Sequence, residues 1–135
     1  MTDPVATESL RELMPLGALL QFSVLSSTAE QVVLSAPWQP EHCTTGGILH
    51  GGYMMALADA AGALCAFKNL PPDTWTSTIE SKTNMIRAVA SGTVTATSNP
   101  VDVGRTTIVV ETDLTRDDGK LAARTTQTQA VMPAS

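Results

Sequence analysis

Residues 46–67 read GGILHGGYMMALADAAGALCAF, and this stretch decides the fold. From Tyr53 to Phe67 it is rich in Ala, Leu and Met, which favour a helix. Apolar residues lie on every side of this helix, so we expect it to be buried nearly all round. Asp59 is the only Asp, Glu, Lys or Arg between Glu41 and Lys68. An unpaired carboxylate costs on the order of several kcal/mol in an apolar setting, so Asp59 needs hydrogen-bond donors, a solvent-facing edge or a chemical role.

The segments on either side of this helix have the composition of strands. They are rich in Val, Thr and Leu, and turn signals such as Asp117-Asp118-Gly119 separate them. The expected strands are Ala18–Ser26, Glu30–Ala36, Thr76–Val89, Thr93–Val103, Thr106–Thr115 and Leu121–Val131. We expect one short helix before them over Thr7–Met14, with Thr7 as its cap and Pro15 at its end.

The order of these elements predicts an α+β fold. Two strands, the buried helix and then four strands in a meander would form one domain over residues 1–135. A long antiparallel sheet can curl around the helix and supply most of the apolar surface that the helix needs. So small a domain cannot cover every side of it, and we expect a second copy of the chain to complete the burial.

The composition argues against several classes of protein. Hydrophobic residues make up 43% of the chain and charged residues 16%, as in globular proteins. The net charge of -5 argues against binding to nucleic acid or to an anionic membrane. Two cysteines and two histidines without ligand spacing indicate neither a disulfide framework nor a metal site. No signal peptide or membrane span is visible, so we expect a cytoplasmic location.

Two glycines after His50 indicate a site at the start of the helix. The first N–H groups of a helix have no internal partner, and glycine lets a ligand oxygen approach them closely. Gly51 and Asp59 are about 12 Å apart along a helix, which is too far for both to act on one carbonyl carbon. They could act together if two helices ran antiparallel across a dimer interface. His50 either caps the helix or donates to a ligand.

The stretch LHGGYMMALADAAG at residues 49–62 closely resembles the signature of hotdog-fold acyl-CoA thioesterases, in the subgroup related to phenylacetate-pathway and 4-hydroxybenzoyl-CoA thioesterases. The resemblance continues in the family's order through TIESKTNMIRAV, GTVTA, VGRTTIVVETDL and GKLAARTTQT, and so spans about Pro40 to Val131. It implies the hotdog fold, in which an antiparallel sheet wraps a long central helix. It also implies a homodimer and, as in many relatives, a tetramer formed from two dimers.

The resemblance implies catalytic roles at the two ends of this motif. The backbone N–H of Gly51 would polarise the thioester carbonyl, and the partner subunit's Asp59 would act as general base or as nucleophile. Relatives often have Asn or Gln six residues before the histidine, where this chain has Thr44. Thr44, Thr45 or His42 would then take the role of that amide.

The resemblance also implies where the substrate binds. A family hydroxyl near the reacting water corresponds to Ser77 or Thr78, although β propensity explains a strand Thr equally well. Exposed arginines are common on strands, but two here match places where relatives touch the CoA tail. The positions expected to contact substrate or CoA are Gly52, Ser77, Arg87, Arg105, Thr106 and Thr107.

We therefore expect hydrolysis of an acyl-CoA thioester without a cofactor, since CoA is part of the substrate. Two alternatives stay open: a hotdog hydratase or dehydratase acting on acyl thioesters, and a non-catalytic acyl-CoA-binding protein. The sequence does not distinguish aryl from short- or medium-chain acyl groups. Candidate residues for an acyl pocket are Trp38, Tyr53, Met54, Met55 and Trp75.

Overall fold

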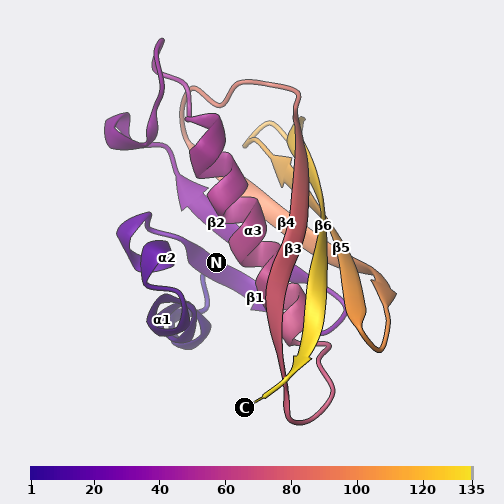
Figure 1. The fold of residues 1–135 in the computed structure, drawn as a ribbon. Coiled ribbons are helices and arrows are strands. Elements are labelled where there is room, and N and C mark those ends of the chain that lie inside the picture. Colours follow the sequence, from indigo (N-terminus) through magenta and orange to yellow (C-terminus); the bar gives the residue numbers. More distant parts are fainter. Residues whose placement is uncertain (135) are drawn as a thin grey trace.

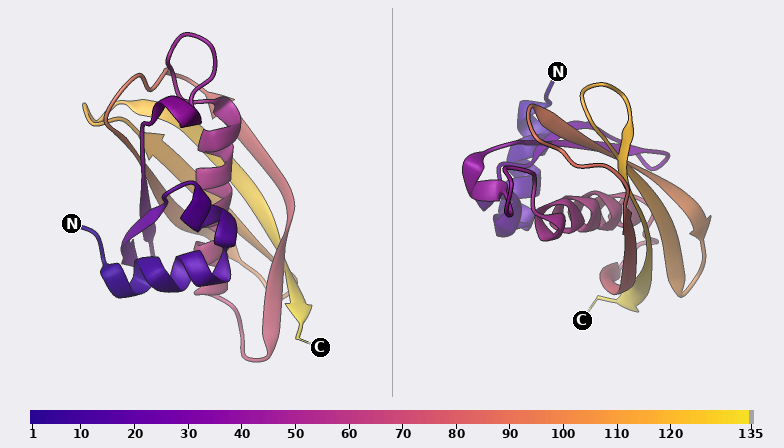
Figure 2. Two further views of the ribbon diagram at one scale, coloured as in Figure 1. Left: turned by 90° about the vertical axis from the view of Figure 1, so that its left-hand side faces the viewer. Right: turned by 90° about the horizontal axis from the view of Figure 1, so that it is seen from above.

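A curved antiparallel sheet of six strands surrounds one long helix, as Figures 1 and 2 show. The computed structural model describes residues 1–134. Its helices and strands are α1 (Pro4–Leu13), α2 (Pro15–Leu19), β1 (Ser23–Ser27), β2 (Val32–Pro37), α3 (Gly51–Phe67), β3 (Thr74–Met85), β4 (Thr93–Val103), β5 (Thr107–Thr115) and β6 (Leu121–Pro133), with a 3-10 turn at Pro40–His42. The expected α+β fold with a helix wrapped by a sheet is confirmed.

Helix α3 lies at the centre of the core and packs against five of the strands. Leu57, Ala58, Ala61 and Cys65 have no exposed surface. Most of these side chains are small, so the sheet can approach the helix closely. The helix begins at Gly51, as the glycine pair predicts, and His50 is its N-cap.

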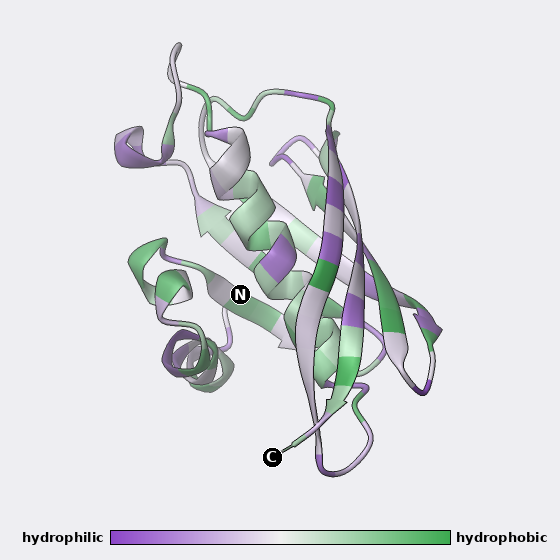
Figure 3. Ribbon diagram, in the orientation of Figure 1, coloured by the Kyte–Doolittle hydropathy of each residue, from purple (hydrophilic) through white to green (hydrophobic). Residues whose placement is uncertain are grey.

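One face of α3 is left uncovered by the sheet. Met55, Asp59 and Phe67, spaced along this face, are exposed, and Figure 1 shows the face between α2 and β3. Figure 3 shows α3 as largely hydrophobic with one hydrophilic band near its middle, and Asp59 is the only charged residue of the helix. The uncovered face agrees with the expectation that the sheet of so small a domain cannot cover every side of α3, because six strands curl only part of the way around it.

The position of β3 differs from the expected meander. Strands β4, β5 and β6 follow one another, but β3 lies beyond β6 at the edge, in the order β1-β2-β4-β5-β6-β3. Strand β3 pairs with β6 along its whole length, and residues 86–92 then carry the chain across to β4. This connection is fixed in the core by Val89, which is 1% exposed and accepts the Leu49 N–H at 2.9 Å. Because it is anchored there, the chain cannot turn back from β3 into a neighbouring hairpin.

The N-terminal segment also differs from expectation. The cap of α1 is Asp3, whose carboxylate accepts a backbone N–H of the first turn at 3.0 Å. Thr7 lies inside α1, and its hydroxyl oxygen accepts a backbone N–H of β1 at 2.9 Å. Pro15 begins the short helix α2 instead of ending the helical region, since proline fits the first helical position. Strand β1 consequently starts at Ser23 and not at Ala18.

Gly92 allows a direct test of the turn that leads into β4. Its φ is +73°, and a Cβ there would overlap the Asp117 Oδ2 atom, which accepts the Thr93 N–H at 3.2 Å. Gly119 has a similar φ of +80° with open space around it, and so provides a matched control. We expect Gly119→Ala to lower the free energy of unfolding by about 1–2 kcal/mol, and Gly92→Ala by about 1–3 kcal/mol more. Urea unfolding measures both, and equal losses would contradict the overlap.

Candidate active site

The carboxylate of Asp59 is held by two side chains of the sheet. Thr78 Oγ1 on β3 donates to Asp59 Oδ1 at 2.9 Å, and Gln127 Nε2 on β6 donates to the same oxygen at 3.0 Å. Neighbouring strand residues point to opposite faces, so Ser77 points away from Asp59. Within residues 1–134 no hydrogen bond reaches Oδ2. The carboxylate therefore has one anchored oxygen and one free oxygen.

A second pair of side chains extends this contact along the sheet. Gln129 Nε2 donates to Thr78 Oγ1 at 2.6 Å, and Thr76 Oγ1 donates to Gln129 Oε1 at 3.0 Å. Gln127 and Gln129 have no exposed surface. Three side chains, Thr76, Gln129 and Thr78, thus form one polar chain that ends on the carboxylate of α3, and Gln127 reaches the same carboxylate separately.

The motif-based analysis of the sequence missed Gln127 and Gln129. The signal that could have revealed them is the alternation of β6, in which every second residue from Ala123 faces the core. Glutamine is mostly exposed in proteins. Two glutamines at core-facing positions of a strand therefore indicate side chains that have specific hydrogen-bond partners in the interior.

His50 caps α3 and takes up most of its free N–H groups. Its Nδ1 atom accepts the Gly52 N–H at 2.8 Å, and its carbonyl oxygen accepts the N–H groups of Tyr53 at 3.0 Å and Met54 at 3.2 Å. The structure thus shows the capping alternative for His50. Among residues 1–134, Gly51 N–H is the one of the first four helical N–H groups without an acceptor. At the positive end of the helix dipole, this N–H is available to a ligand and that of Gly52 is not.

The loop before α3 carries Thr44 and Thr45. The Thr44 N–H donates to the Ile48 carbonyl oxygen at 2.9 Å, beside a bridge between Cys43 and Leu49, so the loop forms a narrow ribbon. Figure 2 shows this loop projecting beyond the start of α3. Both threonines are exposed. Thr44 lies at the base of the ribbon, where it pairs with Ile48, and Thr45 begins the turn beyond it.

Tyr53 and His42 attach the start of α3 to its surroundings. Their rings are stacked with centroids 4.3 Å apart. The Tyr53 hydroxyl donates to the carbonyl oxygens of Leu20 at 2.8 Å and Pro37 at 3.3 Å, and His42 Nδ1 lies 3.0 Å from the same Pro37 oxygen. Burial raises the pKa of Tyr53 to about 12, so this hydroxyl stays protonated and keeps donating. The Nδ1 atom of His42 is therefore already engaged within the fold.

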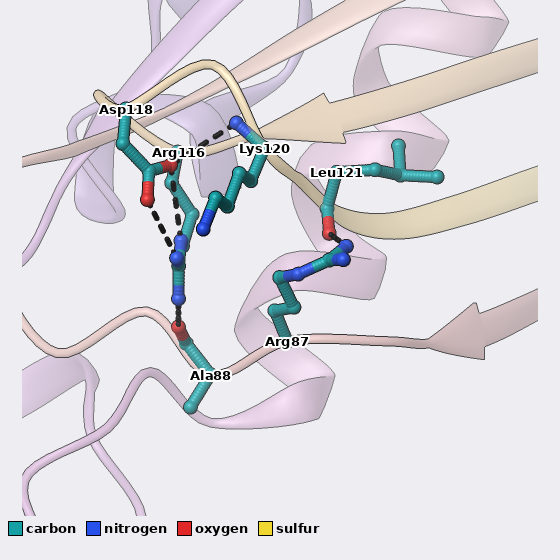
Figure 4. A network of polar contacts seen from close by, with 6 residues as sticks. All are labelled: Arg87, Ala88, Arg116, Asp118, Lys120 and Leu121. Carbon is teal, nitrogen blue, oxygen red and sulfur yellow. Dashed lines mark hydrogen bonds and ion pairs between the residues drawn. The ribbon is translucent and has the colours of Figure 1, made fainter.

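The two candidate arginine positions lie at opposite ends of the sheet. Arg87 follows β3, and its Nη1 atom donates to the Leu121 carbonyl oxygen at 2.8 Å (Figure 4). The segment 105–107 lies at the turn between β4 and β5, where the Val131 N–H donates to the Thr106 carbonyl oxygen at 2.8 Å. Leu121 and Val131 are about 33 Å apart along β6, at roughly 3.3 Å per residue. One chain therefore cannot bring Arg87 and Arg105 to the same phosphate.

Arg87 carries one of the positive charges at its end of the sheet, where Figure 4 also shows Arg116 and Lys120. Its neighbour Arg116 donates to the Ala88 carbonyl oxygen at 3.1 Å and forms an ion pair with Asp118 at 2.6 Å (Figure 4). The hydrogen bond from Arg116 lowers the pKa of Asp118 to about 2. Within the described part of the chain, Arg87 forms no ion pair with a carboxylate. Its charge is available to an anionic ligand.

An apolar cavity of about 390 Å³ lies beside Asp59, between α2 and α3. The other residues that line it are Met14, Leu16, Gly17, Phe22, Ala56, Ala60 and Ala63. None of the five residues expected to line an acyl pocket is among them. Tyr53 and Met54 are buried in the core, and Trp75 packs edge-on against Phe67 with ring centroids 6.0 Å apart. The alanines of α3 make the room for this cavity.

Neither cysteine belongs to the group of residues around Asp59. Cys43 and Cys65 are free thiols, and burial raises the pKa of Cys65 to about 11. Residues 1–134 contain no group of three His, Cys, Asp or Glu side chains arranged to bind a metal ion. Across the same residues, the structure has no helix with the length and hydropathy needed to cross a membrane.

Comparison with known proteins agrees with the hotdog architecture and identifies the family of the chain. The family model of the thioesterase superfamily matches residues 46–123, and the chain belongs to this family. SSO2140 of Saccharolobus solfataricus, which bears the provisional name of an esterase, is 31% identical over 92% of this chain and 89% of its own. A 1,4-dihydroxy-2-naphthoyl-CoA hydrolase of Listeria monocytogenes is 35% identical over 56% of this chain and 61% of its own. The solved structure of a variant of thioesterase PA1618 from Pseudomonas aeruginosa has a TM-score of 0.88 at 29% identity, covering 94% of each chain.

These relatives establish the class of the protein at family level. The chain is a hotdog-fold enzyme of the thioesterase superfamily, whose members include a hydrolase of an acyl-CoA.

Proposed function

We propose that this enzyme hydrolyses the thioester bond of an acyl-CoA at sites formed by two copies of the chain. The observation that carries the proposal is the state of Asp59, which has one oxygen anchored by Thr78 and Gln127 and one free oxygen beside an apolar cavity. A carboxylate held in this way can take a proton from water as general base, or attack the carbonyl carbon as nucleophile. The reaction needs no cofactor, because water and the acyl-CoA are the only reactants.

Gly51 would supply the other half of the site. Its N–H, without an acceptor in residues 1–134, can donate to the thioester carbonyl oxygen and stabilise the negative charge that develops there. Gly51 and Asp59 of one chain are about 12 Å apart along α3. Gly51 of one protomer would therefore work with the partner subunit's Asp59.

Two adjoining surfaces of the chain suit a homodimer. Strand β3 is an edge strand of the sheet, and its outer edge presents backbone groups that pair with no other strand of residues 1–134. Ile79, Met85 and Ile86 are exposed on or just after this strand, at 61%, 48% and 48%. The Thr78–Asp59 hydrogen bond joins β3 to the uncovered face of α3, so one interface would cover both. We propose a dimer that pairs the two β3 edges, and a tetramer made of two such dimers.

Arg87 is a better candidate than Arg105 for holding the phosphates of CoA. It follows Met85, whose Cε atom lies 3.3 Å from the position of a Cβ on Gly51. Arg87 therefore lies at the end of the molecule where the thioester carbonyl would bind. The segment 105–107 lies about 33 Å away along the sheet, at roughly 3.3 Å per residue.

The cavity beside Asp59 would accept the acyl group. Its volume of about 390 Å³ is near the lower end of small-ligand pockets, which span about 300–1,000 Å³. Its lining is apolar, with Phe22 and Leu16 among the larger side chains. These features favour aryl and short- or medium-chain acyl groups, and the name of the Listeria relative gives an aryl-CoA as its substrate. No observation favours the hydratase alternative, since the Nδ1 atom of His50 is engaged as a cap.

Thiol release from a panel of acyl-CoA esters tests this proposal. We expect the chain to release CoA, measured with a thiol-reactive dye, from benzoyl-CoA, naphthoyl-CoA or hexanoyl-CoA. Release from palmitoyl-CoA should be slow, because its chain exceeds the cavity. Absence of release from every ester would contradict the proposal, and binding of an ester without turnover would support the non-catalytic alternative.

A further inference from the structure

Gln127 is buried in a way that its packing alone does not explain. It has no exposed surface, and its Oε1 atom has no hydrogen-bond partner within residues 1–134. A carboxylate can only accept hydrogen bonds, so the amide nitrogen of Gln127 must face Asp59. This orientation turns Oε1 toward α3. An acceptor without a partner in the interior lowers the stability of the fold. The contact of Gln127 with Asp59 is therefore present although it has this cost.

Gly62 makes the space in which the Gln127 amide lies. A Cβ on Gly62 would overlap the Oε1 and Cδ atoms of Gln127. Gly62 is in the interior of α3, where glycine is a poor helix former compared with alanine. The helix and the strand therefore both carry an unfavourable residue at the one point where Gln127 passes α3 to reach Asp59.

Gln129 sets the direction of the hydrogen bond that Thr78 gives to Asp59. Thr76 donates its hydroxyl hydrogen to Gln129 Oε1, which turns Gln129 Nε2 toward Thr78 Oγ1. Because Thr78 Oγ1 accepts from Gln129, its own hydrogen is left for Asp59 Oδ1. If the amide were reversed, the Thr78 hydroxyl would have a competing acceptor in place of a donor.

We propose that Gln127 and Gln129 are positioning residues, which fix the Asp59 carboxylate by Oδ1 and leave Oδ2 as the oxygen that meets the substrate. This inference rests on the proposed function for its kinetic consequence. The contact itself does not rest on the proposed function, because all four hydrogen bonds form within a single chain. Both glutamines act through Asp59 and need not touch the substrate.

The variant Gln127→Met separates positioning from structural support. Methionine has a similar length and fills the same space, but it cannot donate to Asp59 and has no carbonyl oxygen to leave without a partner. We expect kcat to fall about 100-fold, as for a misplaced reacting group, with KM unchanged and the melting temperature maintained or raised. A merely structural role would lower the melting temperature and leave kcat of the folded protein unchanged.

Thr112→Val is the matched control. Thr112 is a fully buried residue of β5 whose hydroxyl bonds to Ser98 at 2.5 Å, apart from the Asp59 group. This variant also removes a buried polar atom from the sheet, and it leaves the Ser98 hydroxyl without its partner. We expect the melting temperature to fall and kcat to stay unchanged, which is the opposite pattern to that of Gln127→Met.

Gly62→Ala gives an independent test through a double-mutant cycle with Gln127→Ser. Gly62→Ala should lower kcat, because its methyl group displaces the Gln127 amide. The serine of Gln127→Ser is too short to meet that methyl group, so adding Gly62→Ala to Gln127→Ser should not lower kcat further. Additive losses in the cycle would overturn the proposal.

The cycle between Gln127→Met and Asp59→Ala, read by urea unfolding, keeps this inference apart from the proposed function, because alanine removes the oxygen that accepts from Gln127. If wild type released no thiol but the two substitutions coupled in stability, the contact would stand and the proposed function would fail. If wild type hydrolysed acyl-CoA and Gln127→Met kept its full kcat, the positioning role would be overturned and the proposed function would stand.

Discussion

Asp59→Asn should lower kcat for acyl-CoA hydrolysis by about 100- to 10,000-fold, the range for loss of a general base. Asparagine has the same shape and can accept from Thr78 and Gln127 through its carbonyl oxygen, so the local structure should persist. Its amide cannot take a proton from water or attack a thioester. Asp59 is exposed in the single chain, so we expect the melting temperature to change little.

Asp102→Asn is the control for this substitution. Asp102 is also an exposed aspartate, and it lies on β4, which contributes neither of the side chains that donate to Asp59. Asp102→Asn removes one negative charge, as Asp59→Asn does. The rate of acyl-CoA hydrolysis by Asp102→Asn should equal that of wild type. Thiol release at saturating substrate measures all three proteins. Full activity in Asp59→Asn would contradict the proposal that this carboxylate acts as general base or nucleophile.

Gly51→Pro should lower kcat by about 100- to 1,000-fold, as removal of one oxyanion donor does. Proline deletes the backbone N–H, and it suits the first position of a helix. The preceding residue, His50, has φ −60° and ψ 134°, which is the extended conformation that a residue before proline prefers. Met85 Cε is the nearest atom, at the end of a flexible side chain. The variant should therefore fold.

Gly51→Ala is the matched control, because alanine keeps the N–H and also adds a Cβ. Its Cβ would lie 3.3 Å from Met85 Cε, which needs to move by only a few tenths of an ångström. We expect Gly51→Ala to keep most of the activity. Equal losses in the alanine and proline variants would show that bulk matters at this position and not the N–H.

Mixing the two inactive variants tests whether the site is shared between protomers. A mixed dimer of Asp59→Asn and Gly51→Pro has one site with both changes and one site with neither. Random exchange of subunits should therefore restore about a quarter of the wild-type rate if each site uses two chains. A mixture that remains inactive after verified exchange would show that both groups belong to one chain.

The local elements of the fold could be predicted from the sequence. The glycine pair and the Ala- and Leu-rich run define α3 because helix propensity and capping act over a few residues. Strand β4 has the bounds expected, Thr93–Val103, since turn residues flank it on both sides. The hotdog fold followed from the motif around His50 and Asp59 together with these elements.

The parts that were missed depend on contacts between distant segments. The pairing of β3 with β6 leaves a long connection to β4 that is buried at Val89, and no local pattern shows that this residue lies in the core. The anchoring of Asp59 depends on Gln127, which lies on β6, a distant part of the chain. The cap of α1 is an exception, because Asp3 makes a local contact with the first turn and the sequence analysis placed the start of the helix at Thr7 instead. The exposure of Asp59 depends on how far the sheet curls.

The pairing of β3 with β6 also sets when the site can form as the chain is made. Asp59 and Gln127 are separated by 68 residues, and Thr78 and Gln129 by 51. A nascent chain emerges N-terminal end first, so α3 and β3 leave the ribosome before β6 exists. Strand β4 can pair with β5 as soon as both are present, but β3 has no partner until β6 has followed. The last strand to be synthesised therefore completes both the sheet and the anchoring of the Asp59 carboxylate, and a chain that ended before β6 would have neither of them complete.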